Sequence, residues 1–202
     1  KKKQLEKLST LAKIVRVNAE ANMQNLVPDE YILEKNRELM NNEIVLFESN
    51  LSKLNTSINI LNEQIKQKEN ELKENEAKLI ILRNSHLLLT KEIDIKKVLV
   101  HDKIISEVDF LQLKRRYNDT DLELKNTQSM IPILNSSIAE LYENIEDAKE
   151  KYKNDAKNQI VESYSKLQTI EEEINLLNDK INNSIIKSPR NGTVNVITVK
   201  TK

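Results

Sequence analysis

The chain has 202 residues, of which 32% are charged and 3% aromatic, with one glycine, three prolines and no cysteine. So few turn residues and so little aromatic bulk disfavour a compact globular core and favour a small number of long elements. The 32 basic and 32 acidic residues cancel, which excludes an overall attraction to nucleic acid or anionic lipid, and the lack of cysteine excludes disulfide and thiol chemistry.

The first predicted element is a short helix over residues 1–26. A helical stripe of apolar residues marks one face, and the segment "NLVPDE" then breaks the chain at Pro28; the stripe is Leu5, Leu8, Ala12, Val15 and Ala19. The chain reads as helix from its first residues, and no run of about 18 apolar residues could cross a bilayer. A helix that starts without a cap and a β-segment that ends without a partner lead us to expect a part of a longer protein. We expect this first helix to lie beside the base of the elements that follow.

The second predicted element is a long helix over residues 29–102. Its inner seam has alternating steps of three and four residues: Leu33, Arg37, Met40, Ile44, Phe47, Leu51, Leu54, Ile58, Leu61, Ile65, Lys68, Leu72, Asn75, Leu79, Leu82, His86, Leu89 and Ile93. Such a strict heptad repeat is typical of a left-handed coiled coil.

The third predicted element is a helix over residues 107–184 with a seam of the same kind. Its members are Phe110, Leu113, Tyr117, Thr120, Leu124, Thr127, Ile131, Leu134, Ile138, Leu141, Ile145, Ala148 and Tyr152. Pro132 should kink this helix, because proline removes a backbone hydrogen bond. After Tyr152 the register slips by about one residue before Ile160, Tyr164, Leu167, Ile170, Ile174, Leu177 and Ile181, a change that often marks where a third helix joins.

The two long helices should form an antiparallel hairpin, because the turn at residues 103–106 is short. Ser106 is the expected N-cap of the third helix, followed by acidic residues in the first turn. Facing seam residues then have numbers that add to about 202 or 203. The polar exceptions match under this rule, with Asn75 opposite Thr127 and His86 opposite Tyr117, so that they satisfy one another rather than face leucine.

The final segment, residues 185–202, differs from everything before it. "IIKSPRNGTVNVITVK" predicts two strands and a turn at Pro189, Asn191 and Gly192. Two strands alone are marginally stable in water, so we expect them to complete a small β-domain that the hairpin interrupts.

These features resemble the HlyD family of periplasmic adaptors, also called membrane fusion proteins. "IIKSPRNGTV" resembles the segment by which the chain of these proteins leaves the hairpin and enters the second half of a lipoyl-like domain. Residues 38–65 resemble the ascending helix, and residues 96–119 the tip, of adaptors serving type I secretion. At the tip, Leu99 and Ser106 match the family pattern, whereas Ile95 stands at its arginine position and Asp102 or Lys103 replaces its usual glycine.

The resemblance implies a fold and a function. The fold is all-α, a long antiparallel coiled-coil hairpin with a short extra helix at its base, plus the C-terminal β-piece of an interrupted lipoyl-like domain. The function is a link, anchored in the inner membrane and usually hexameric, between an inner-membrane ABC transporter and a TolC-like outer-membrane channel of Gram-negative bacteria, without a cofactor. The implied docking tip is Leu99, Val100, His101, Lys103, Ile104, Ile105 and Ser106.

Other interpretations are open at this stage. An adaptor of a multidrug efflux pump would have the same tip and the same β-segment after the hairpin. A purely structural tethering coiled coil would favour a parallel dimer. His86 could be a pH switch or metal ligand, but a core histidine bonded to Tyr117 fits better because the sequence places no second histidine or carboxylate opposite it. Nucleic-acid binding by "LKRRYND", residues 113–119, and lipoylation or biotinylation of Lys187 or Lys200 are disfavoured, and no catalytic or metal-binding pattern is present.

Overall fold

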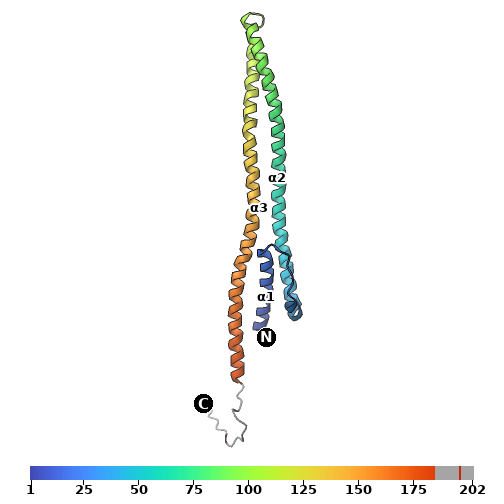
Figure 1. The fold of residues 1–202 in the computed structure, drawn as a ribbon, viewed down its shortest axis with the longest axis vertical. Helices are drawn as coiled ribbons and strands as arrows, with labels where there is room; N and C mark the ends of the chain where they lie inside the picture. The colour runs from blue at the N-terminus through green and yellow to red at the C-terminus, as the bar shows by residue number, and fades with distance from the viewer. Residues whose placement is uncertain (185–195, 197–202) are drawn as a thin grey trace. The chain divides into compact units, whose positions relative to one another are not determined.

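The computed structural model describes residues 1–184 and Val196, and these residues contain three α-helices and no strand. Helix α1 spans Lys2–Ala21, α2 spans Glu30–His101 and α3 spans Glu107–Ser184 (Figure 1). The predicted helical class and hairpin are thus confirmed. Apart from Val196, the predicted β-segment, with Pro189, Asn191, Gly192 and the two lysines considered for modification, lies outside the described residues.

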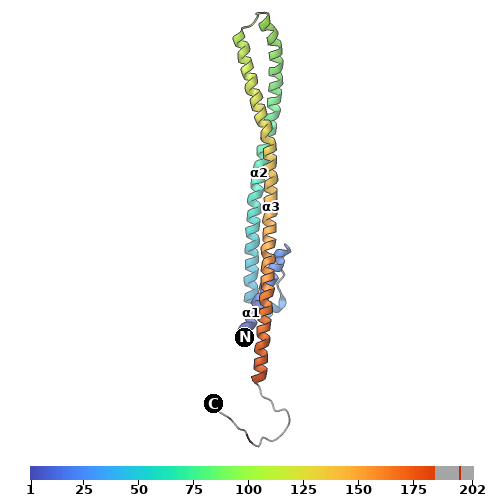
Figure 2. The same cartoon turned by 90° about the vertical axis from the view of Figure 1, so that its left-hand side faces the viewer.

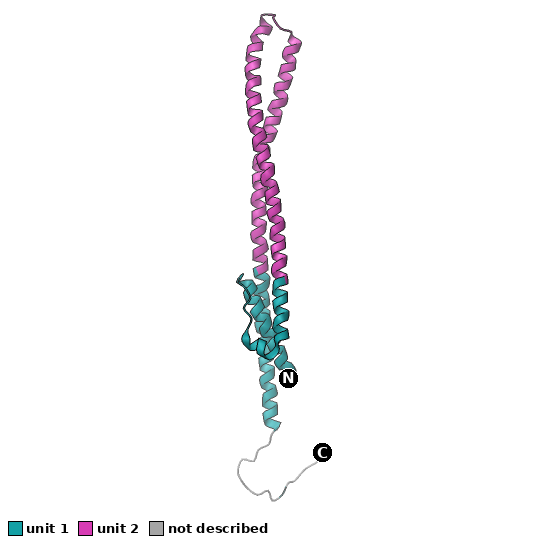
Figure 3. Ribbon diagram, turned by 90° about the vertical axis from the view of Figure 1, so that its right-hand side faces the viewer, with its two compact units in different colours: residues 1–48, 153–202 teal, residues 49–152 magenta. Residues whose placement is uncertain are grey.

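The chain divides into two compact units, which we call the base and the hairpin unit (Figure 3). The base contains residues 1–48 and 153–202, and the hairpin unit contains residues 49–152. This division cuts through both long helices, and the domain boundaries expected from the sequence stay a prediction.

In the hairpin unit, α2 and α3 lie side by side and cross each other (Figure 2). Every buried residue here is a predicted seam position: Leu54, Ile65, Leu79, Leu82, Leu113, Thr127, Leu134 and Ile145. The rings of His86 and Tyr117 lie 4.7 Å apart between centroids, and Lys78 Nζ lies 2.6 Å from Glu123 Oε1. These residue numbers add to 203 and 201, which confirms the predicted antiparallel register.

In the base, α1 packs on α2 and α3, as the sequence predicted for a short extra helix. The core is a cluster of Ala12, Ile32 and Met40, which brings α1 and α2 together. Lys7 Nζ lies 2.7 Å from Glu171 Oε1, and Lys3 also pairs with Glu173, so ion pairs join α1 to α3.

The first helix ends earlier than predicted, at Ala21 rather than near residue 26. The N–H of Met23 donates to the carbonyl of Glu20, the N–H of Gln24 donates to that of Ala19, and Met23 has a φ of 53°. This is a Schellman cap, which satisfies the last carbonyls of the helix. The cap, not Pro28, therefore ends α1.

Helix α2 contains a break that the seam pattern did not reveal. Asp29 Oδ1 accepts the N–H of Ile32 at 3.1 Å and caps the start of the helix. Asn36 then has extended backbone angles (φ −159°, ψ 90°), and its Oδ1 accepts the N–H of Leu39 at 3.3 Å. Because Asn36 begins a new helical phase, the predicted seam member Arg37 is exposed instead of facing the core.

Helix α3 continues through Pro132 as one helix, and the kink expected there stays a prediction. The register slip after Tyr152 is present: the predicted seam member Ile170 is buried, together with Ala156 and Ser163, which were not predicted. The prediction of Tyr164 is wrong, because its neighbour Ser163 is buried instead, and the last predicted members, Leu177 and Ile181, are exposed. Small residues face inward at Ala156 and Ser163, which lets a third helix approach closely.

Candidate functional site: the hairpin tip

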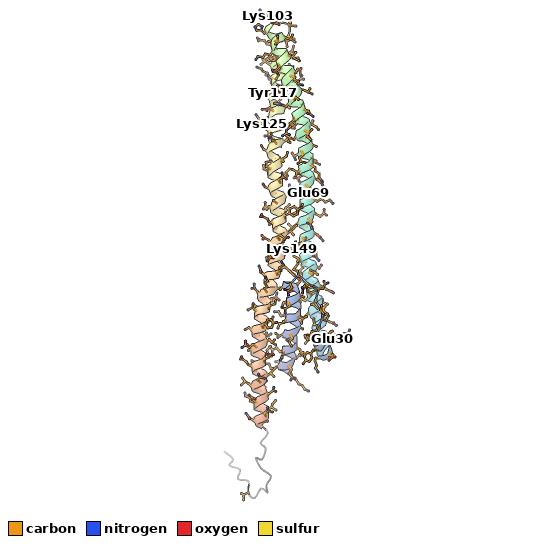
Figure 4. The ribbon with its side chains drawn as sticks, in the orientation of Figure 1. Glu30, Glu69, Lys103, Tyr117, Lys125 and Lys149 are labelled. Atoms are coloured by element: carbon orange, nitrogen blue, oxygen red, sulfur yellow. The ribbon has the colours of Figure 1, made fainter. Side chains whose placement is uncertain are left out.

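The tip is the turn between α2 and α3, where Figure 4 labels Lys103. The N–H of Lys103 donates to the carbonyl of Val100 at 3.0 Å, and the N–H of Ile104 donates to that of Leu99 at 2.9 Å. This is the same Schellman arrangement that ends α1. The turn is therefore held by the backbone and does not depend on a partner.

Lys103 is the residue with a left-handed backbone, with a φ of 56°. The sequence left open whether Asp102 or Lys103 replaces the expected tip glycine, and the backbone assigns that position to Lys103. A side chain at a positive φ carries a steric penalty that glycine does not have. The tip thus adopts the glycine conformation without glycine.

Ser106 caps the start of α3. Its Oγ accepts the N–H of Val108 at 3.2 Å, its carbonyl accepts the N–H of Phe110 at 3.2 Å, and Glu107 and Asp109 occupy the first turn. The predicted N-cap is confirmed, and the acidic residues complement the helix dipole.

Apolar side chains flank the turn. Val98 and Ile104 are 59% and 66% exposed, whereas Leu99, Val100 and Ile105 are half-buried. The side chain of His101 is exposed, and its Nδ1 lies 3.2 Å from Asp102 Oδ1. Two of these five apolar side chains are therefore exposed to solvent, and the other three are partly covered.

Sequence reasoning missed further exposed apolar residues near the tip. Ile95, Val108 and Leu111 are each more than half exposed, at 64%, 61% and 55%. Each lies off the predicted seam, so an apolar residue at an outer heptad position was the signal available in the sequence.

The polar layer of His86 and Tyr117 includes a carboxylate that the sequence reasoning had excluded. Asp121 Oδ1 lies 3.4 Å from His86 Nε2, an atom that is buried and makes no hydrogen bond to the described residues. Asp121 lies one turn beyond Tyr117 on α3, and i,i+4 residues share a helix face. Lys125, labelled with Tyr117 in Figure 4, donates to Asp121 and lowers the pKa of its carboxyl group.

The second predicted polar layer is arranged differently from expectation. The amide of Asn75 donates to the carbonyl of Glu71 in its own helix at 2.8 Å. Thr127 is 5% exposed. The Asn75 donor is thus satisfied locally rather than by the opposite helix.

The base holds a buried charge cluster that the sequence did not predict. Arg16 and Glu20 are each 3% exposed, and Arg16 donates to Glu20 Oε2 at 2.8 Å, to Glu43 Oε2 at 2.6 Å and to Gln159 Oε1 at 3.3 Å. Burial alone would lower the pKa of Arg16, but the hydrogen bond to Glu43 and the charge of Glu20 outweigh it and raise that pKa. A permanently charged guanidinium therefore ties α1 to both long helices.

The described residues contain no group of three or more histidine, cysteine, aspartate or glutamate side chains that could hold a metal ion. None of the helices among them is long and apolar enough to span a membrane. What this part of the chain offers is a pinned turn with apolar side chains around it, an arrangement suited to contact with another protein.

A long antiparallel helical hairpin with an additional helix at its base defines the class of protein. The sequence profile of the family described as "AprE, long alpha-helical hairpin" matches residues 3–180, and the chain belongs to this family. The resemblance to secretion adaptors stated from the sequence is confirmed at this level.

Among solved structures, one similar chain is the soluble domain of LipC, described as a membrane fusion protein of a type I secretion system. The TM-score is 0.83 at 16% sequence identity, and the match covers 94% of this chain and 92% of that chain. At this identity, the likeness shows a shared fold. The search of curated proteins found no match.

Proposed function

We propose that this chain is the hairpin region of a periplasmic adaptor for type I protein secretion. The full-length protein would be anchored in the inner membrane and join an ABC transporter there to a TolC-like outer-membrane channel, with several copies, six by expectation, in the assembly. Membership of the hairpin family and the fold shared with the soluble domain of LipC support this role. Neither the family nor that neighbour is described as an enzyme.

The tip is the observation that carries the docking role. Val98 and Ile104 expose apolar surface at the point where the chain reverses. Burying such surface against a partner is favourable. The Schellman cap and the Ser106 cap hold the turn before docking, so little conformational entropy would be lost on binding. Leu99, Val100, His101, Lys103, Ile105 and Ser106 complete the proposed docking surface.

Site-specific photo-cross-linking from position 104 to a co-expressed outer-membrane channel tests this role. Ile104 is exposed, so replacing it leaves the fold intact, and Ile60, which is 56% exposed on α2, is the matched control far from the turn. We expect a channel adduct from position 104 and none from position 60. The absence of an adduct from every residue between 96 and 107 would contradict docking.

The alternative of a tethering coiled coil favours a parallel dimer. In this chain the two seams instead pair within one hairpin, as the contact of His86 with Tyr117 shows. An efflux-pump adaptor would share the hairpin and the tip. Transport assays of a cell lacking the protein separate the two adaptor roles, because secretion fails in one case and drug resistance falls in the other.

A further inference from the structure

The base contains a groove that is lined by side chains from all three helices. Leu8 and Leu11 come from α1, Tyr31 and Lys35 come from the start of α2, and Ile174 comes from α3. The volume of the groove is about 450 Å³, within the range of sites that hold small molecules. In Figure 1, α1 lies between α3 and the start of α2. The groove therefore belongs to the junction at which the first helix joins the two long ones.

The apolar residues of the groove are not fully covered by the protein. Leu8, Leu11 and Ile174 are each half-buried, and Leu11 packs against the buried cluster of Ala12, Ile32 and Met40. The ring-bearing residue at the start of α2, Tyr31, is 58% exposed. Apolar surface that stays in contact with water favours a ligand that covers it.

The charged residues of the groove are both cations. Lys7 and Lys35 line it, and none of the described residues around it is acidic. Lys7 Nζ is paired with Glu171 Oε1 at 2.7 Å. Lys35 Nζ lies 5.8 Å from the centroid of the Tyr31 ring and forms no ion pair with any described residue. A cation next to an aromatic ring keeps its charge, so Lys35 leaves a positive charge beside apolar surface.

We propose that this groove binds a long-chain carboxylate, such as a free fatty acid. The hydrocarbon chain of the ligand covers Leu8, Leu11 and Ile174, which removes apolar surface from water. The carboxylate of the ligand pairs with the ammonium group of Lys35. The inference does not depend on the proposed adaptor role, because it uses only the residues of the base.

The chemistry of the groove separates this ligand from other classes of molecule. An inorganic anion has no apolar part to cover the leucines. A neutral hydrocarbon leaves the charge of Lys35 without a counter-charge, and a cationic amphiphile meets a like charge there. A molecule with an apolar chain and an anionic end makes use of both features.

A ligand in this position contacts α1, α2 and α3 at once. Any molecule that binds the folded base and not the unfolded chain stabilises the fold, by an amount that grows with its concentration. The bound carboxylate therefore acts together with the ion pair of Lys7 and Glu171 to hold α1 on the two long helices.

Equilibrium dialysis of the full chain against radiolabelled laurate, below its critical micelle concentration, tests the proposal. We expect saturable binding of a single laurate per chain, and binding of dodecyltrimethylammonium that is weaker by about fivefold or more. Lys35→Gln should weaken laurate binding about fivefold, as expected for the loss of an exposed ion pair. Lys53→Gln is the matched control, because Lys53 is also an exposed lysine of α2 but lies in the hairpin unit.

A second variant tests the apolar part of the groove. Ile174→Gln keeps both lysines and removes apolar surface, so it should weaken the binding of laurate and leave the preference for the anionic amphiphile in place. Circular dichroism checks that the variant keeps its helices. Unchanged laurate binding by a folded Ile174→Gln chain would overturn the proposed position of the hydrocarbon chain.

Three further results would overturn the proposal. They are the absence of saturable laurate binding, equal affinities for Lys35→Gln and Lys53→Gln, and equal affinities for the two amphiphiles. Vesicles of phosphatidylglycerol separate a free carboxylate from a membrane surface. Co-sedimentation of the chain with these vesicles, without laurate binding in dialysis, would assign the groove to a lipid bilayer and also contradict the proposal.

Discussion

The base and the hairpin unit bury different kinds of residue. In the hairpin unit two helices meet along one stripe, and the buried side chains there are aliphatic apart from Thr127. In the base a third helix covers the other two, and Arg16 and Glu20 are buried with the apolar core. Two helices leave every long charged side chain a route to water, whereas three can enclose one, so a buried ion pair depends on α1.

The largest expected effect comes from breaking the buried cluster. Arg16→Ala leaves Glu20 and Glu43 without their guanidinium, and removing one partner of a buried ion pair typically costs about 3–5 kcal/mol. Urea denaturation followed by circular dichroism measures the loss. Lys7→Ala, which removes an exposed ion pair with Glu171, is the control and should cost no more than about 1 kcal/mol. Equal losses in the two variants would contradict a special role for burial.

Substituting alanine for one core residue in each unit should distinguish the base from the hairpin unit further. Met40 is fully buried in the base and Leu113 is 3% exposed in the hairpin unit, so each change to alanine should cost about 2–5 kcal/mol. Because Met40 belongs to the cluster that holds Ala12, its loss should also loosen α1. Hydrogen exchange should speed up in α1 for Met40→Ala and stay unchanged there for Leu113→Ala; the same α1 response to both variants would refute the division.

Glycine substitution at the two Schellman caps should act in the same direction in both units. Lys103 and Met23 hold positive φ angles, so Lys103→Gly and Met23→Gly should each stabilise the fold by about 0.5–1 kcal/mol. Asp102 has no such backbone angle, so Asp102→Gly should destabilise it. Thermal unfolding measures all three, and stabilisation by Asp102→Gly would show that the tip is assigned wrongly.

The smallest effect is the response to acid. The hydrogen bond from Lys125 lowers the pKa of Asp121 in the hairpin unit, and that from Lys3 lowers the pKa of Glu6 in the base. A carboxyl group with a lowered pKa stabilises the fold above its unfolded pKa, and this contribution disappears as the pH falls through the folded value. Asp121→Asn and Glu6→Gln should therefore lower the melting temperature slightly at pH 7 and have no effect near pH 2.

The hairpin unit could be predicted from the sequence because one rule governs it. A strict heptad predicted the seam, and the match of its polar members predicted the direction of α3 and the contact of His86 with Tyr117. Ser106 marked the start of α3, because a cap is a local feature. Asp121 was missed near His86 because only direct seam opposites were considered, although a side chain one turn away can also reach across.

The base was harder to predict because its geometry depends on three helices at once. From the sequence alone, a charged residue such as Arg16 is expected to be exposed to solvent. Its burial can be predicted only when the position of the helices packed around it is known. Tyr164 was assigned to the seam by its apolar character, but Ser163 is the buried neighbour because α1 needs a small residue there. At the tip, the choice of Lys103 over Asp102 depends on one backbone angle that no side-chain pattern encodes.

The most direct test of the account is the distance between α2 and α3 within one chain. Nitroxide labels at Lys78→Cys and Glu123→Cys, both half-exposed, can be measured by pulsed electron resonance in chains diluted with unlabelled protein. Helices that pack 8–10 Å apart predict a mean label distance below about 25 Å. A distance near 65 Å, the value for about 45 residues in one continuous helix, would contradict the hairpin and with it the docking tip.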